Sequence, residues 1–232
     1  MRRKERGEPQ LFGLLERPMR SPQQAMDTVT YKIFLVGRSG VGKSAMVAKL
    51  AGLSEPVVHH GTPGIQTTTV YWPFQPAGSE RSLMFRFQLW DCGETAMKKF
   101  DHILPACKEK ADAVVFVFAF TNRSSFMDLP QDMANILDPS KNLLCLAVGT
   151  KYDNSLQNDV SEAEVCKFER TSHVPVFRVG STSGANNGVV PSSIAALLNG
   201  LAECLWHQDK IAAGVIASCP PPLFAKMTNS TS

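Results

Sequence analysis

Two continuous apolar runs, residues 113–119 and 143–148, mark the centre of the predicted fold. A strand that helices cover on both sides has no polar face, so its sequence is apolar throughout. Both runs are therefore predicted to be central parallel strands. A shorter run at residues 174–179 follows the same pattern and predicts a final strand.

Three further segments also have strand patterns. Residues 29–36 form a strand pattern that ends at Gly37, and a helix is predicted from about residue 43 to 51. Residues 66–74 and 82–90 predict two more strands. In the second of these, apolar residues alternate with polar ones, which is typical of a sheet face partly open to water.

Helices are predicted between the later strands. Ser161 and Glu164 have the spacing of a capping box. An apolar stripe with helical spacing predicts another helix near the end of the chain: Ile194, Leu197, Leu198, Leu201 and Leu205. Six strands that alternate with helices predict an α/β fold with a mostly parallel sheet and helices on both faces. In such sheets the ligand site lies at the carboxyl ends of the strands, here the loops after residues 36, 90, 148 and 179.

Length and composition limit the alternatives. The 232 residues, 44% of them hydrophobic, suffice for one core, and a net charge of +3 argues against nucleic acid as a partner. We expect a flexible extension at residues 1–27, one domain at 28–208 and a tail at 209–232. No apolar run is long enough to span a membrane, and the six cysteines lack a CxxC pair, which favours a reducing, cytoplasmic compartment.

The segment Gly37–Ser44 matches the P-loop pattern GxxxxGK[ST], with a predicted strand before it and a helix after it. Glycines let the loop curl so that its N–H groups point at phosphate oxygens. Lys43 would neutralise the β- and γ-phosphates, and the Ser44 hydroxyl would bind Mg²⁺. The residues predicted to line the phosphates are Ser39, Gly40, Val41, Gly42, Lys43, Ser44 and Ala45.

The segment Thr150-Lys151-Tyr152-Asp153 follows the second buried strand and resembles the [NT]KxD motif with which Ras-like GTPases bind guanine. A carboxylate such as Asp153 can accept both of guanine's adjacent N–H hydrogen bonds, whereas adenine presents an acceptor at that ring nitrogen. A P-loop ATPase or nucleoside kinase is the alternative, but adenine or phosphoacceptor recognition is not evident. The resemblance to Ras-like GTPases covers roughly residues 29–206, and Rab members give the closest parallels in the magnesium-binding and switch regions. It implies GTP or GDP with Mg²⁺ as ligands.

Two further segments resemble the Rab magnesium and switch motifs. Thr62-Pro63-Gly64-Ile65 is similar to TIGV, and the resemblance implies that the Thr62 hydroxyl completes the magnesium shell and that its N–H senses the γ-phosphate. Thr67, Thr68 and Thr69 are alternatives, although a strand is predicted there. Residues 89–94, Leu-Trp-Asp-Cys-Gly-Glu, resemble WDTAGQE with one residue missing, which assigns Asp91 to the magnesium site.

The same segment departs from the family. The catalytic glutamine is absent, and Glu94 or Thr95 stands in its place, while Gly93 would be the γ-phosphate-sensing glycine if one residue is missing. Ser39 stands where the P-loop of Ras has a glycine. The missing side chain of that glycine leaves room for an incoming arginine finger. Both changes predict slow GTP hydrolysis. Gly180-Ser181-Thr182 faintly resembles the Ser-Ala pair that follows the final strand in this family, and the resemblance implies that Ser181 contacts the base.

The chain resembles the Rem- and Rab-like small GTPases in three features. These are the departures just described, a C-terminal end without a prenylation cysteine, and the sequence of residues 201–209. The resemblance implies protein effectors, namely Fuzzy and Inturned, at the basal body of the cilium. It also implies roles in cilium assembly, planar cell polarity, the cytoskeleton, and targeted vesicle transport and exocytosis. Two hypotheses remain open: a switch whose partner binding depends on GTP, and a structural subunit that holds GTP as a fixed cofactor.

Overall fold

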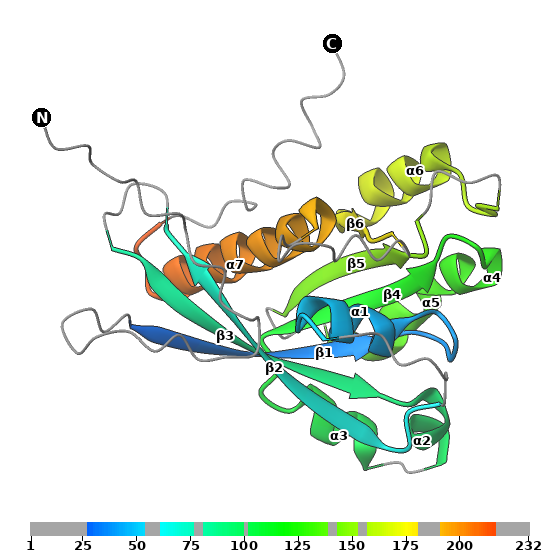
Figure 1. Ribbon diagram of the computed structural model, residues 1–232, viewed down its shortest axis with the longest axis horizontal. Helices are drawn as coiled ribbons and strands as arrows, with labels where there is room; N and C mark the ends of the chain where they lie inside the picture. The colour runs from blue at the N-terminus through cyan, green and yellow to red at the C-terminus, as the bar shows by residue number, and fades with distance from the viewer. Residues whose placement is uncertain are drawn as a thin grey trace, which may run out of the picture.

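The computed structural model describes residues 27–53, 61–76, 81–99, 102–138, 143–152, 157–180 and 191–216. In this part of the chain, six strands form one sheet of order β2-β3-β1-β4-β5-β6 (Figure 1). The strands are β1 (Thr28–Val36), β2 (Ile65–Phe74), β3 (Leu83–Cys92), β4 (Ala113–Ala119), β5 (Leu144–Thr150) and β6 (Val176–Arg178). Among the strands of the described residues only β2 and β3 pair antiparallel, so the predicted fold class is confirmed.

Helices cover both faces of this sheet. They are α1 (Lys43–Leu50), α2 (Glu94–Lys99), α3 (Ile103–Lys108), α4 (Arg123–Met127), α5 (Leu129–Ile136), α6 (Glu162–Ser172) and α7 (Ser192–Ala212). The sheet, α1 and α7 enclose one core, and side chains from α2 to α6 meet the opposite face in a second core. Successive residues of β1 serve the two cores in turn, as Ile33 and Phe34 do, because side chains alternate along a strand.

Several predicted element ends shift in the structure. β3 continues past residue 90 because Cys92 pairs with Ile65, and β5 extends to Thr150, which pairs with Ala119. Only residues 176–178 of the predicted last strand pair with β5, although the run is buried over most of its length. These ends follow the pairing of neighbouring strands, which the hydrophobic pattern does not encode.

Two predicted helix features are confirmed. The Ser161 hydroxyl accepts a hydrogen bond from the N–H of Glu164 at 3.3 Å, and the Glu164 carboxylate accepts one from the N–H of Ser161 at 3.0 Å. The five residues of the apolar stripe are all buried on α7. This helix runs past residue 208, the predicted end of the domain, to Ala212, and Asp209 accepts a hydrogen bond from the hydroxyl of Tyr31 on β1 at 2.7 Å. In the described part of the chain, none of the helices has the length and apolarity that crossing a membrane requires.

Candidate nucleotide site

The loop at residues 37–42 connects β1 to α1 and needs glycine at more than one position. A Cβ at Gly37 would lie 2.2 Å from the carbonyl oxygen of Val117 on β4, so no side chain fits there. Gly42 has a φ of 96° and forms the N-cap of α1. This helix has no side-chain cap and no acidic residue in its first turn. Its first N–H groups are therefore left for another acceptor, as an anion site requires.

Lys43 begins α1 and folds back over the loop. Its side-chain amine donates hydrogen bonds to the carbonyl oxygens of Gly37 at 2.6 Å and Arg38 at 3.1 Å. Burial lowers the pKa of Lys43, while the carboxylates of Asp91 and Glu94 oppose that shift. The loop thus holds one buried cation that faces two carboxylates.

Three oxygen-bearing side chains from separate segments converge beside this lysine. The Ser44 hydroxyl donates to Asp91 Oδ2 at 2.5 Å and lies 3.1 Å from the hydroxyl of Thr62. Asp91 is 1% exposed, and its second carboxylate oxygen has no hydrogen-bond partner among the described residues. A buried carboxylate oxygen without a donor, next to two hydroxyls, fits a hard divalent cation such as Mg²⁺. The alternatives Thr67, Thr68 and Thr69 lie in β2, paired with β3.

The backbone around Thr62 packs directly against Gly93. The N–H of Gly93 donates to the carbonyl oxygen of Gly64 at 2.9 Å, and a Cβ at Gly93 would lie 2.0 Å from the carbonyl oxygen of Thr62. A side chain at residue 93 would therefore fit only if the backbone at Thr62 shifted. In this arrangement its N–H group binds a protein carbonyl, whereas the resemblance had assigned it to the γ-phosphate.

Glu94 and Thr95, the two positions predicted in place of the catalytic glutamine, have different surroundings. Glu94 is the first residue of α2, and its carboxylate accepts a hydrogen bond from the N–H of Ser39 at 2.6 Å. Thr95 is exposed on the same helix. The structure thus brings Glu94 to the P-loop, a contact that the sequence did not signal.

The loop after β5 also meets the P-loop. The Thr150 hydroxyl lies within hydrogen-bond reach of the carbonyl oxygens of Val41 and of Phe118, the latter at 3.0 Å. The Lys151 amine donates to the carbonyl oxygen of Gly40 at 2.9 Å. The loops after β1 and β5 therefore converge, as expected for the carboxyl ends of parallel strands. Asp153 and Ser181 lie outside the described residues.

Residues 32–199 match the family model described as the Ras family. The chain belongs to the Ras family. Proteins of this family bind guanine nucleotides, generally with Mg²⁺.

This Ras-family chain is 49% identical over 213 residues to "Ciliogenesis and planar polarity effector 2" of Xenopus laevis. The match covers 88% of this chain and 86% of that protein. It is 51% identical over 209 residues to the protein of the same name from Danio rerio, with 90% and 81% coverage. Similarity to human "GTP-binding protein REM 2" is lower, at 29% identity over 136 residues, with 58% and 38% coverage.

Arg38 anchors the Ras-family P-loop in a way that no sequence motif signals. The Arg38 guanidinium donates to the Ser124 hydroxyl at 3.1 Å and forms an ion pair with Asp128, so it ties the loop to α4 and to the N-cap of α5. Arginine at an unassigned position of the P-loop pattern carries no signal for this role, because Ser124 and Asp128 are distant in sequence.

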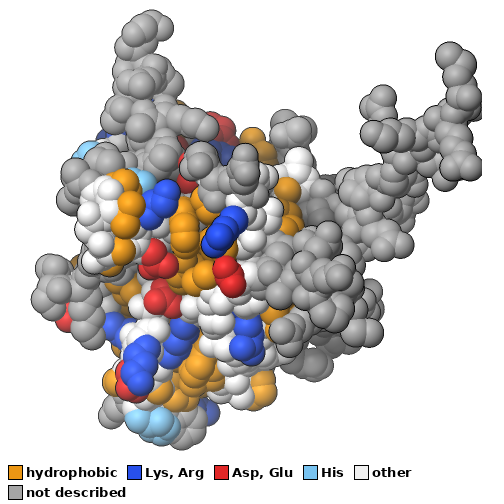
Figure 2. Space-filling view, turned by 90° about the vertical axis from the view of Figure 1, so that its left-hand side faces the viewer, with side chains coloured by type: hydrophobic (Ala, Val, Ile, Leu, Met, Phe, Trp, Pro, Cys, Tyr) orange, Lys and Arg blue, Asp and Glu red, His pale blue; other side chains and the backbone are white. Residues whose placement is uncertain are grey.

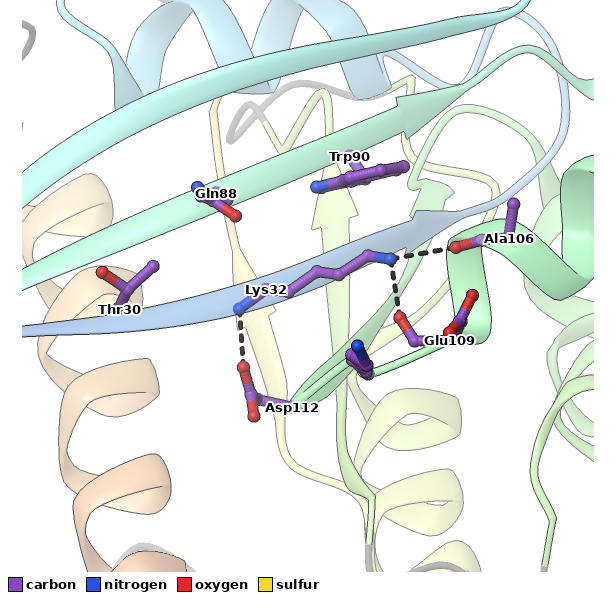
Figure 3. Close-up of a pocket in the computed structure, with 8 residues that line it drawn as sticks. Thr30, Lys32, Gln88, Trp90, Ala106, Glu109 and Asp112 are labelled. Atoms are coloured by element: carbon purple, nitrogen blue, oxygen red, sulfur yellow. Dashed lines mark hydrogen bonds between the residues drawn. The ribbon is translucent and has the colours of Figure 1, made fainter.

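A pocket of about 530 Å³ lies elsewhere, on the sheet face next to α3 (Figure 3). Its lining includes no P-loop residue. Lys32 lies along β1, and its amine donates to the carbonyl oxygens of Ala106 and Glu109 while it packs 3.9 Å from the ring centre of Trp90. Asp112 accepts the N–H of Lys32 at 2.7 Å. These contacts tie the end of α3 to the sheet.

The molecular surface seen in Figure 2 combines basic and acidic side chains, with hydrophobic ones between them. A partner that docked on this face of the Ras-family domain would therefore meet charges of both signs. Selectivity for such a partner would come from the arrangement of charges more than from their net sign.

Proposed function

We propose that this protein binds GTP and GDP with Mg²⁺ at the loops after β1, β3 and β5. The observation that supports the proposal is the convergence of the Ser44 and Thr62 hydroxyls on the buried carboxylate of Asp91, beside Lys43. Ser44 and Thr62 would contact the metal, and Asp91 would orient them and balance its charge. When bound, Mg²⁺ offsets the negative charge of the phosphates.

The base would be recognised at the loops after β5 and β6. We propose that Asp153 accepts the two adjacent guanine N–H groups and that Ser181 adds a further contact. The Lys151 side chain crosses the P-loop at Gly40 and so fixes the base-binding loop relative to the phosphate-binding loop. Supporting this arrangement, the N–H of Tyr152 donates to the carbonyl oxygen of Val179, and the Lys49 amine donates to that of Gly180.

Hydrolysis of GTP by this protein is proposed to be slow. An amide that orients the attacking water is missing, and the residue in its place, Glu94, is a carboxylate. The Ser39 side chain, exposed on the P-loop, occupies space that an arginine finger would need. Such a finger raises the rate of hydrolysis by a factor on the order of 10³ to 10⁵. An activating protein that supplies an arginine finger would therefore accelerate hydrolysis only slightly here.

The cellular role is proposed from the relatives. Their printed name, ciliogenesis and planar polarity effector 2, supports a role in cilium assembly and planar polarity. We further propose Fuzzy and Inturned as partners, in the cytoplasm at the basal body, with a role in targeted vesicle transport, exocytosis and the cytoskeleton.

A structural subunit with a fixed nucleotide is the second proposal, and one contact favours it. The hydrogen bond from Gly93 to Gly64 continues the ladder between β2 and β3 and joins the two segments that a switch would separate. If this bond persists with GDP, the exchange of GTP for GDP leaves both segments in nearly the same position. Partner binding would then be equal with GDP and GTP.

The nucleotide proposal is tested by equilibrium binding of GTP, GDP and ATP with and without Mg²⁺. We expect GTP and GDP to bind and ATP to fail, with affinity lost on chelation of the metal. Lys43→Ala should lower the affinity for GTP at least about 100-fold, since a charge-assisted contact to phosphate is lost. Lys167→Ala, which removes an exposed lysine of α6, is the matched control and should bind like the wild type. Equal binding of ATP and GTP would contradict the guanine assignment.

The partner proposal is tested with Ser44→Asn, a substitution that should lower the affinity for Mg²⁺ and for GTP together. For a switch, a complex of Fuzzy and Inturned should bind the wild type with a GTP analogue, bind it weakly with GDP, and not bind Ser44→Asn. For the structural subunit, the wild type should bind equally with either nucleotide. Undiminished binding of Ser44→Asn without nucleotide would contradict both roles for GTP.

A further inference from the structure

The carboxylate of Glu94 occupies the rim of the phosphate-binding loop. It accepts the N–H of Ser39 at 2.6 Å, and Ser39 is exposed at the third position of the P-loop. Backbone N–H groups of this loop are the groups that bind phosphate oxygens in P-loop proteins. One of them is therefore bonded to an anion that belongs to the protein itself.

The same carboxylate acts on the loop's cation. Lys43 is 6% exposed, and Asp91 and Glu94 are the two carboxylates whose charges stabilise its charged form. Asp91 is fixed by the Ser44 hydroxyl on the metal side. Glu94 approaches from the start of α2 and directly follows Gly93, the glycine that the resemblance assigns to the γ-phosphate.

We propose that Glu94 determines nucleotide preference: its carboxylate opposes the γ-phosphate and makes the site select GDP over GTP. The inference rests on the proposed nucleotide site. GDP lacks the phosphate that would approach Glu94, so the bond to Ser39 persists in the GDP state. GTP brings additional negative charge towards a fixed carboxylate, and like charges in a partly buried site repel strongly. Glu94 must then leave Ser39, and it carries the first turn of α2 with it.

This arrangement differs from a switch that only attracts the γ-phosphate. Here the start of α2 is held to the P-loop without the γ-phosphate and is pushed away when it arrives. A partner that recognises α2 would thereby distinguish the two nucleotide states, although residue 94 is not the glutamine that the family uses for hydrolysis.

The test compares dissociation constants for GDP and for a non-hydrolysable GTP analogue, both with Mg²⁺, across four proteins. Glu94→Gln keeps an oxygen that can accept the N–H of Ser39 but removes the charge. We expect it to bind the GTP analogue about tenfold more tightly while GDP changes by less than about twofold, as the loss of one like charge predicts. Glu94→Asp keeps the charge and should stay within about threefold of the wild-type ratio.

Glu109→Gln removes one carboxylate charge at the C-cap of α3 and is the control, with an expected ratio equal to that of the wild type. A damaged fold would weaken both nucleotides together, so the ratio separates charge from structure. If both nucleotides bind the wild type and Glu94→Gln leaves their ratio unchanged, the inference is overturned while the nucleotide site stands. If the wild type binds neither nucleotide, the nucleotide site is wrong, and this inference is wrong with it.

Discussion

The P-loop and the segment that faces it, residues 61–64 together with 91–95, are stabilised in opposite ways. Side chains hold the P-loop by its carbonyl oxygens: Lys43 binds those of Gly37 and Arg38, Lys151 binds that of Gly40, and Thr150 reaches that of Val41. The facing segment instead offers oxygen atoms to the P-loop side, through Thr62, Asp91 and Glu94.

The contacts to the carbonyl oxygens prepare the P-loop for an anion. A peptide whose carbonyl oxygen is fixed on one side presents its N–H on the other side, so donors bound to the carbonyls orient the N–H groups inward. The facing segment contacts the loop through its side chains, while its own backbone is held by the ladder between β2 and β3. We therefore expect substitutions in the P-loop to change stability, and substitutions in the facing segment to change nucleotide response.

Gly37→Ala should have the largest effect on stability. Its Cβ would meet the carbonyl oxygen of Val117, which belongs to a fully buried central strand and has no room to move. We expect the free energy of unfolding to fall by about 2–3 kcal/mol, as for other overpacked interiors. Urea denaturation of the two proteins measures it, and Gly214→Ala, where φ is 68° instead of the 153° of Gly37 and a Cβ meets no atom within 4 Å, shows the cost of a positive φ without a clash. A loss no larger than that of Gly214→Ala would show that β4 can yield.

Thr150→Val should have an intermediate effect. The valine preserves shape but removes a buried hydroxyl that reaches the carbonyls of Val41 and Phe118. We expect a loss of about 1–2 kcal/mol in the free energy of unfolding, because a buried carbonyl loses its donor. Thr150→Ser restores the hydroxyl and should recover most of this loss in the same denaturation experiment. Destabilisation by serine as large as that by valine would show that the hydroxyl alone does not account for the contribution of Thr150.

Gly93→Ala should have the smallest effect on stability. The clash with the carbonyl oxygen of Thr62 is as severe as at Gly37, but Thr62 lies outside any helix or strand, so its backbone can shift. We expect a loss below about 1 kcal/mol in the free energy of unfolding. The shift would displace the Thr62 hydroxyl, so the Mg²⁺ concentration needed for half-maximal GTP binding should rise. An unchanged Mg²⁺ requirement would contradict a role for Thr62 at the metal.

Much of the fold was predictable because its signals are local. The apolar runs at residues 113–119 and 143–148 gave the central strands, and the glycine pattern at 37–42 gave the turn into α1. Ends of strands were less predictable. The extension of β3 to Cys92 depends on its pairing with Ile65, which lies on another strand.

The family, and the residues expected in the nucleotide motifs, can be read from the chain alone, since each motif is a short run with fixed spacing. The packing of strands and helices selects which of four threonines lies beside Ser44, and it brings Glu94 rather than Thr95 to the P-loop. It also anchors Arg38 on Ser124 and Asp128. These contacts join residues that are far apart along the chain, and their partners are chosen by the packing of the sheet and its helices, which no local pattern records.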